Sequence, residues 1–282
     1  MQEISLEGVS VRFGGVAALN EVTLGIEPGE KLAVIGASGA GKSTLFRALT
    51  RTVPLHGGRV IVGGHDLYAL SRRRLKDVRR RIGTIHQAYN LVPQLSAGIN
   101  AALGEVGGMG SAKTLRTLLG GLDADLAGRV RNALERIDLE DKVGTRTAEL
   151  SGGQQQRVAV ARLLVQSPDL VLADEPFAAV DPVTTARVLE SLLELNRAGV
   201  SLLVNLHDVE IARRFPRIVA LREGRIAFDG PPARLTDGRL TQIYAGEPYG
   251  TVEESIPETG VTRPLTEVPI RVAEGRDGVS SH

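Results

Sequence analysis

The sequence predicts an α/β fold: a mainly parallel sheet, an antiparallel flap at the start of the chain, and a helical subdomain inserted in the middle. Short apolar runs such as 31–35 and 170–173 alternate with longer segments of helical period. Strands that alternate with helices form parallel sheets that are covered on both faces. Ahead of these segments, residues 4–13 alternate apolar and polar side chains, which is typical of a half-exposed strand.

The first thirty residues predict the flap. We expect its strands at 4–13 and 22–26, with a turn at Gly14-Gly15 and a tight turn at 27–30, where proline favours the geometry. Phe13 then lies at the tip of the flap. An aromatic ring there could stack on an adenine face, and a plain core phenylalanine is the alternative interpretation.

Residues 36–44 fit the phosphate-binding loop pattern, Gly, four residues, Gly-Lys-Ser, without a mismatch. A buried strand at 31–35 enters the loop and a helix at 45–49 leaves it. The glycines let consecutive backbone N–H groups turn inward as a nest for anionic oxygens, and the helix N-terminus adds partial positive charge. The pattern therefore predicts a nucleotide and Mg²⁺ as ligands in a P-loop NTPase (RecA-like) fold, with binding residues Gly36, Ser38, Gly39, Gly41, Lys42, Ser43 and Thr44.

The next segments are a short glycine-bounded strand at 57–64 and a basic helix at 71–81. Seven of the eleven residues from 71 to 81 are basic. They could contact lipid headgroups or phosphates, and a solvated helix face is the alternative. A strand at 82–86 then leads into Gln87, a polar side chain at the strand end where α/β sheets hold ligands.

Residues 88–166 predict the helical subdomain. Within it, 123–137 carries one apolar stripe of helical period, formed by Leu126, Val130, Leu134 and Ile137. The run Leu-Ser-Gly-Gly-Gln at 150–154 precedes a long helix at 155–165.

The second half of the sheet begins with a buried strand at 170–173, which delivers Asp174 and Glu175 at its carboxyl end. A helix is expected at 183–198, and a strand at 201–206 ends at His207. A short helix at 208–215 and strands at 218–221 and 225–228 complete the predicted domain, residues 1–245.

Composition narrows the class of protein. The chain has 42% apolar and 24% charged residues, a net charge of +1 and no cysteine. These values fit a globular protein without disulfides and give no electrostatic reason to expect nucleic acid. No apolar run reaches the ~18 residues of a membrane span, and no leader-like segment opens the sequence. Residues 246–282 carry seven acidic residues against three arginines, and their Pro, Thr and Ser content predicts a flexible acidic tail. A short strand or docking segment at 265–272 is the alternative interpretation.

These motifs together resemble the ATP-binding subunit of ABC transporters, over residues 3–245. The run at 150–154, placed between the two phosphate motifs, is the most specific match. A finer resemblance is to the ATPases of phosphonate importers, and it is carried by residues 90–96, 104–107, 204–209 and 228–230.

The resemblance implies a role for each matching residue. Phe13 would stack on adenine, Asp174 would hold Mg²⁺ through water together with Ser43, and Glu175 would polarise the attacking water. Gln87 would touch Mg²⁺ or the water and sense the membrane subunit, and His207 would contact the γ-phosphate. The γ-phosphate held by a second copy of the chain would meet Ser151, Gly152, Gly153 and Gln154, with Asp181 near the dimer crossing.

The sequence departs from the family at 177–181, which reads Phe-Ala-Ala-Val-Asp, and at His86, where an aromatic residue is common.

The expected partners are two transmembrane permease subunits and, indirectly, a solute-binding protein, at the cytoplasmic face of the membrane. Uptake of phosphonate, phosphite or phosphate-like anions is the leading interpretation. A lipid or lipoprotein exporter and a soluble ATP-gated clamp are the alternatives.

Overall fold

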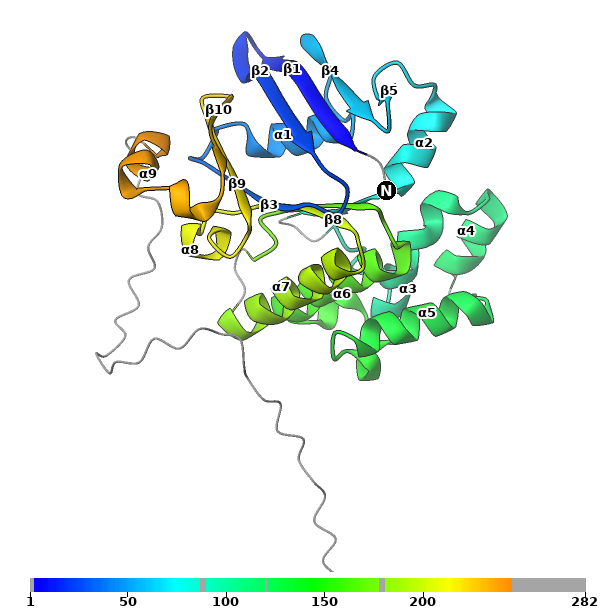
Figure 1. The fold of residues 1–282 in the computed structure, drawn as a ribbon. Helices are drawn as coiled ribbons and strands as arrows, with labels where there is room; N and C mark the ends of the chain where they lie inside the picture. The colour runs from blue at the N-terminus through cyan, green and yellow to red at the C-terminus, as the bar shows by residue number, and fades with distance from the viewer. Residues whose placement is uncertain (1–2, 87–89, 120, 178–180, 245–282) are drawn as a thin grey trace, which may run out of the picture. The chain divides into compact units, whose positions relative to one another are not determined.

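The computed structural model describes residues 3–86, 90–119, 121–177 and 181–244 (Figure 1). Their strands form two sheets. One has four strands in the order β2-β1-β4-β5, and the other has six in the order β10-β9-β3-β8-β7-β6. The predicted α/β fold with an antiparallel flap is therefore confirmed. The predicted domain boundary and the tail at 246–282 stay predictions, since the tail lies outside the described residues.

The four-stranded sheet, here called the flap sheet, is larger than the sequence predicts. Its central strand β1 (Ile4–Phe13) pairs antiparallel with β2 (Val16–Ile26) and with β4 (Gly57–Val62), and β5 (His65–Asp66) extends the edge. The second strand of the flap begins at Val16 rather than at residue 22. Its early part pairs with the end of β1, as in Arg12 opposite Ala17, and this pairing rather than the alternation of residues extends the strand.

The six-stranded sheet holds β3 (Lys31–Ile35), β8 (Ser201–Asn205), β7 (Leu170–Asp174) and β6 (Ile82–Ile85) in parallel. On the other side β3 pairs in parallel with β9 (Arg217–Arg222), which forms an antiparallel hairpin with β10 (Arg225–Gly230). Because β3, β7 and β8 are adjacent, the loops that follow their carboxyl ends meet at one edge of the sheet.

Side chains of the six-stranded sheet alternate between two hydrophobic cores. Leu32 and Val34 face a core shared with the flap sheet and α1 (Lys42–Leu49), whereas Ala33 and Ile35 face a core shared with the helical layer. A strand that is buried on both faces has a continuous apolar sequence, and such apolar runs are what predicted these strands.

The helical layer contains the inserted subdomain. Its helices are α3 (Ala97–Ala102), α4 (Ser111–Leu118), α5 (Ala124–Glu135) and α6 (Gly152–Gln166), with 3₁₀ turns η1 (Leu103–Gly108), η2 (Glu140–Lys142) and η3 (Thr147–Glu149). Asp123 caps α5 by accepting a hydrogen bond from the Leu126 N–H at 2.9 Å. The apolar stripe predicted here, Leu126, Val130, Leu134 and Ile137, is buried, with Ile137 just beyond the end of α5.

The remaining helices are α2 (Arg72–Arg80), α7 (Pro182–Arg197), α8 (Val209–Ala212), α9 (Asp237–Ile243) and the 3₁₀ turn η4 (Pro232–Arg234). The sequence predicted α8 over 208–215, and only its first turn is α-helical. Among the described helices, none combines the length and apolar character that a bilayer crossing requires.

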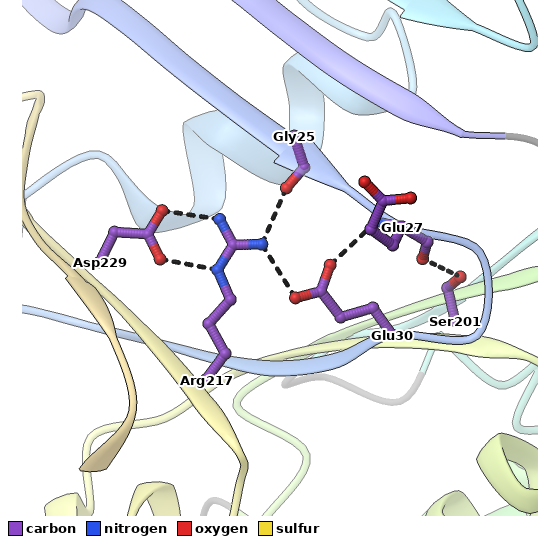
Figure 2. A network of polar contacts seen from close by, with 6 residues as sticks. All are labelled: Gly25, Glu27, Glu30, Ser201, Arg217 and Asp229. Carbon is purple, nitrogen blue, oxygen red and sulfur yellow. Dashed lines mark hydrogen bonds and ion pairs between the residues drawn. The ribbon is translucent and has the colours of Figure 1, made fainter. Parts of the chain in front are cut away.

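Arg217 on β9 ties the flap sheet to the six-stranded sheet. Figure 2 shows its guanidinium forked onto the Asp229 carboxylate, with both N–O distances 2.6 Å. The same group donates to the Gly25 carbonyl at 3.0 Å and to Glu30 at 2.9 Å, and these carboxylates raise the pKa of Arg217. The turn that leads into β3 is therefore held by a charge-assisted network.

Candidate functional site

The phosphate-binding loop lies between β3 and α1, as predicted. Three of its glycines have positive φ: 144° at Gly36, 74° at Gly39 and 107° at Gly41. A Cβ atom at Gly36 would lie 2.2 Å from the Leu221 carbonyl oxygen, and one at Gly41 would lie 2.3 Å from that of Ala18. Both close approaches require glycine, so the motif is fixed by packing as well as by backbone conformation.

Lys42 is buried, with 5% of its surface exposed. Its Nζ donates to the carbonyl oxygens of Gly36 at 2.7 Å and Ala37 at 2.9 Å. A buried ammonium group is costly unless it is hydrogen-bonded, and here the loop itself supplies these acceptors. These two hydrogen bonds hold the lysine ammonium group at the phosphate-binding loop.

A small pocket of about 180 Å³ opens beside the loop. Its lining joins the loop to the ends of β7 and β8 and consists of Ala18, Ser38, Gly39, Ala40, Gly41, Lys42, Ser43, Thr44, Glu175 and His207. Eight of these residues were predicted as site residues from the sequence, namely all but the two alanines. Ala18 comes from β2, and no pattern in the sequence marks it.

Ser43 and Asp174 form a hydroxyl–carboxylate pair next to this pocket. The Ser43 hydroxyl donates to Asp174 Oδ1 at 3.3 Å, and Asn205 Nδ2 donates to the same oxygen at 2.5 Å. Asn205 is completely buried and lies opposite Asp174 in the pairing of β7 with β8. Asn205 was not expected at the site from the sequence, because it ends an apolar strand and only the register of the sheet brings it to Asp174.

Glu175 follows Asp174 with a φ of 52°, which is unusual for a residue other than glycine. Its backbone N–H donates to the Asn205 carbonyl at 3.2 Å, and its Oε1 lies 2.5 Å from Nε2 of His207. A carboxylate only accepts, so His207 Nε2 carries the proton in this contact. Backbone strain of this kind is concentrated at functional sites, where surrounding contacts hold it.

The run at 150–154 lies apart from this pocket, at the start of α6. Ser151 and Gln154 form a capping box, in which Ser151 Oγ accepts from the Gln154 N–H at 3.3 Å and Gln154 Oε1 accepts from the Ser151 N–H at 2.9 Å. A Cβ atom at Gly153 would lie 2.9 Å from the Thr184 hydroxyl oxygen, so α6 packs closely against α7 here.

Asp181 caps α7 beside this contact. It accepts hydrogen bonds from the Thr184 backbone at 2.9 Å and hydroxyl at 2.6 Å, and these bonds hold its pKa below the usual value. Phe13 is 46% exposed at the end of β1 and is not part of the pocket lining. Gln87 and residues 178–180 lie outside the described residues.

The glycine-rich loop between strand and helix, its buried lysine and the hydroxyl–carboxylate pair define a P-loop nucleotide-binding ATPase. The ABC transporter family matches residues 19–178. The chain is 43% identical to the phosphonates import ATP-binding protein PhnC of Alcaligenes faecalis, over 92% of this chain and 93% of that one. It is 42% identical to the phosphonates import ATP-binding protein PhnC 1 of Halalkalibacterium halodurans, over 86% of this chain and 94% of that one. The chain belongs to the ABC transporter family and is one of its ATP-hydrolysing subunits.

Solved structures agree with this assignment. A dimeric post-hydrolysis state of the ATP-binding cassette MJ0796, bound to ADP and phosphate, is 31% identical and has a TM-score of 0.71. The match covers 81% of this chain and 98% of that one. The ADP conformation of the cassette MJ1267 is 25% identical with a TM-score of 0.75, over 88% and 100%.

Proposed function

We propose that this ATPase drives the import of phosphonates and related phosphorus oxyanions. The observation that carries the ATPase part is the convergence of Lys42, Ser43, Glu175 and His207 on one pocket. The names of the relatives, which are 41–43% identical over most of the chain, support the solute class.

The donor set beside the pocket fits Mg²⁺. Ser43 and Asp174 offer oxygen ligands, which a hard cation prefers. Within the described residues no group of three or more His, Asp or Glu side chains gathers, so the other ligands would be phosphate and water oxygens, as Mg²⁺ prefers. When bound there, Mg²⁺ neutralises charge on the β- and γ-phosphate oxygens. Gln87 is proposed as a further ligand or water contact.

The chain's own residues would perform three tasks. The loop from Gly36 to Thr44 binds the phosphates through backbone N–H groups, and Lys42 moves from its loop carbonyls to the β- and γ-oxygens. Glu175 orients the attacking water and accepts its proton. His207 would keep that carboxylate in place through Nε2 until the nucleotide binds, and the same N–H would then contact the γ-phosphate.

A single chain leaves the other side of the triphosphate open to water. We propose that a second copy closes it with the start of its α6, where Ser151, Gly152, Gly153 and Gln154 present an anion-binding helix end. Asp181, packed beside that helix end, would lie near the crossing between copies. Exclusion of water strengthens every electrostatic contact with the transferred phosphoryl group. Phe13 would contact adenine from the flap sheet.

Two permease subunits would hold the chain at the cytoplasmic face of the membrane, and a solute-binding protein would act through them. Because the solute would cross the membrane through those partners, solute selectivity would reside in them. Uptake measured in cells that carry this chain with its membrane partners tests the proposal. We expect ATP-dependent uptake of methylphosphonate or phosphite that is lost in Glu175→Gln and kept in Glu140→Gln, a change of an acidic residue outside the pocket. Uptake of an amino acid, sugar or lipid with no response to phosphorus oxyanions would contradict the solute assignment.

A further inference from the structure

Gln156 is a completely buried polar residue on α6, shortly after the capping box of Ser151 and Gln154. Its side chain extends from the helix to Pro176, where Nε2 donates a hydrogen bond to the carbonyl oxygen. A carbonyl oxygen only accepts, so the nitrogen of the amide must face it. Pro176 directly follows Glu175, and the bond therefore ends one residue beyond the carboxylate that is proposed to orient the attacking water.

This bond fixes a part of the chain that lies beyond the sheet. Strand β7 ends at Asp174, and the Glu175 N–H still donates to the carbonyl of Asn205 on β8. Pro176 has no backbone N–H, so its carbonyl oxygen is the one backbone polar group through which it can be anchored. Gln156 supplies that anchor from the helical layer.

Glu175 needs such an anchor because of its backbone conformation. A φ of 52° is unfavourable for glutamate, and it persists only where neighbouring contacts hold it. Asn205 holds Glu175 itself, and Gln156 holds the residue that follows it. Two hydrogen bonds, one from the sheet and one from the helical layer, thus fix the backbone from which the carboxylate extends.

The alternative interpretation is that Gln156 only fills the core beside α6. The other polar atom of its amide argues against this. Oε1 is buried and has no hydrogen-bond partner among the residues that the structure describes. A buried acceptor without a partner is destabilising, and an apolar side chain of similar volume would avoid that cost. Packing alone therefore does not explain a glutamine here, whereas the hydrogen bond to Pro176 does.

We propose that Gln156 is a positioning residue for ATP hydrolysis, which holds the Glu175 carboxylate in place through the Pro176 carbonyl. The inference deepens the proposed function, because it rests on the roles proposed there for Glu175 and for the site shared between two copies. Helix α6 begins with the residues that would close the nucleotide site of the second copy, and the same helix holds the carboxylate of its own site. A shift of α6 therefore moves Pro176 and, with it, Glu175.

Steady-state ATPase kinetics of Gln156→Met test the proposal. Methionine is unbranched and of similar length, but it cannot donate to the carbonyl. We expect kcat to fall by about 10- to 100-fold, because a displaced reacting group costs that much, and KM for ATP to stay within about twofold. Gln166→Met, the same substitution at the end of α6, is the matched control. It removes hydrogen bonds to the carbonyls of Arg80 and Ile82 and should keep the wild-type kcat.

Two further measurements separate positioning from stability. Rates are expressed per chain that binds a fluorescent ATP analogue, so that unfolded material does not lower kcat. The urea midpoint of Gln156→Met should change little, because the substitution removes the unpartnered Oε1 together with the hydrogen bond. Gln156→Asn keeps the amide but is one methylene group too short for Pro176, and it should lower kcat as well. A wild-type kcat in either variant overturns the proposal, and so does a rise in KM with kcat unchanged.

A mixing experiment shows on which nucleotide site Gln156 acts. When Gln156→Met chains are mixed with Lys42→Ala chains, the one intact loop of each mixed dimer belongs to the chain that lacks Gln156. Activity should therefore stay below that of Gln156→Met alone at the same total chain concentration. Ser151→Ala chains mixed with Lys42→Ala chains should by contrast recover about a quarter of wild-type activity. An equal recovery with Gln156→Met would mean that Gln156 acts on the nucleotide of the second copy, which overturns the proposal.

Glu175→Gln, measured in parallel, keeps two kinds of failure apart. Near-normal turnover in Glu175→Gln removes the proposed role of that carboxylate, on which the inference rests. Loss of turnover in Glu175→Gln together with normal turnover in Gln156→Met removes only the role of Gln156 and leaves the proposed function intact.

Discussion

Nε2 of His207 lies 2.5 Å from Oε1 of Glu175, and this contact joins the residues that follow β8 and β7. Glu175 is held a second time through its backbone, because its N–H donates to Asn205 on the neighbouring strand. Its φ of 52° shows that the chain accepts an unfavourable conformation at this residue. Two strands thus fix the carboxylate beside the phosphate-binding loop.

Lys42→Ala should weaken nucleotide binding itself. The substitution removes a charge-assisted contact to phosphate, which is worth about 1.5–3 kcal/mol, or roughly 10- to 100-fold in affinity. Titration with a fluorescent ATP analogue measures the change. Lys31→Ala, at the opposite end of β3, is the control and should bind normally. Equal affinity in Lys42→Ala and the wild type would remove Lys42 from the phosphate site.

Asn205→Ala should raise the Mg²⁺ concentration needed for half-maximal ATPase activity. Asn205 orients the Asp174 carboxylate, and loss of a partner that orients a metal ligand costs about 10- to 100-fold in metal affinity. Asn196→Ala is the matched control, since the Asn196 side chain donates to the carbonyls of Gly29 and Val200 rather than to Asp174. An unchanged Mg²⁺ dependence in Asn205→Ala would mean that Asp174 needs no orientation.

The sequence predicted the loop, Asp174, Glu175 and His207 because each is a local pattern: a motif, or a polar residue that ends an apolar strand. It could not predict Asn205 or Ala18. Asn205 reaches Asp174 through the parallel register of β7 with β8, and Ala18 reaches Gly41 through the fold of the flap sheet. Both are tertiary relationships between residues far apart in the chain.

The basic run at 71–81 shows the same limit. Its charge and helical period are visible in the sequence, and α2 forms there with Ser71 as its N-cap. What its basic side chains lie against depends on the positions of η1 and α6, which come later in the chain. Local pattern therefore predicts the helix, and only the packed structure shows which segments lie beside it.

Composite sites should form when two defective chains are mixed. A mixture of Lys42→Ala and Ser151→Ala chains contains roughly half mixed dimers, each with one intact site of two, so about a quarter of wild-type activity is expected. Each variant alone should be nearly inactive. Circular dichroism of Ser151→Ala checks that loss of its cap has not unfolded α6. No recovery of activity on mixing would contradict sharing of the site between copies.

Arg217→Lys should destabilise the fold without changing the nucleotide site. Lysine cannot make the forked contact with Asp229 while also reaching Gly25 and Glu30 (Figure 2), so we expect the free energy of unfolding to fall by about 2 kcal/mol. Arg225→Lys alters an exposed pair with Glu21 and should change it by less than about 0.5 kcal/mol. Urea denaturation compares the two, and equal losses would refute the structural role of the network.

The ATPase rate of Glu175→Gln tests the central claim most directly. Glutamine keeps the shape of the side chain but cannot accept a proton from water, so turnover should fall by about 10²- to 10⁴-fold. ATP affinity, measured on the same preparation, should stay close to that of the wild type, because Lys42 and the loop are unchanged. Phosphate production at a near-normal rate by this variant would contradict the assignment of Glu175 as the residue that activates water.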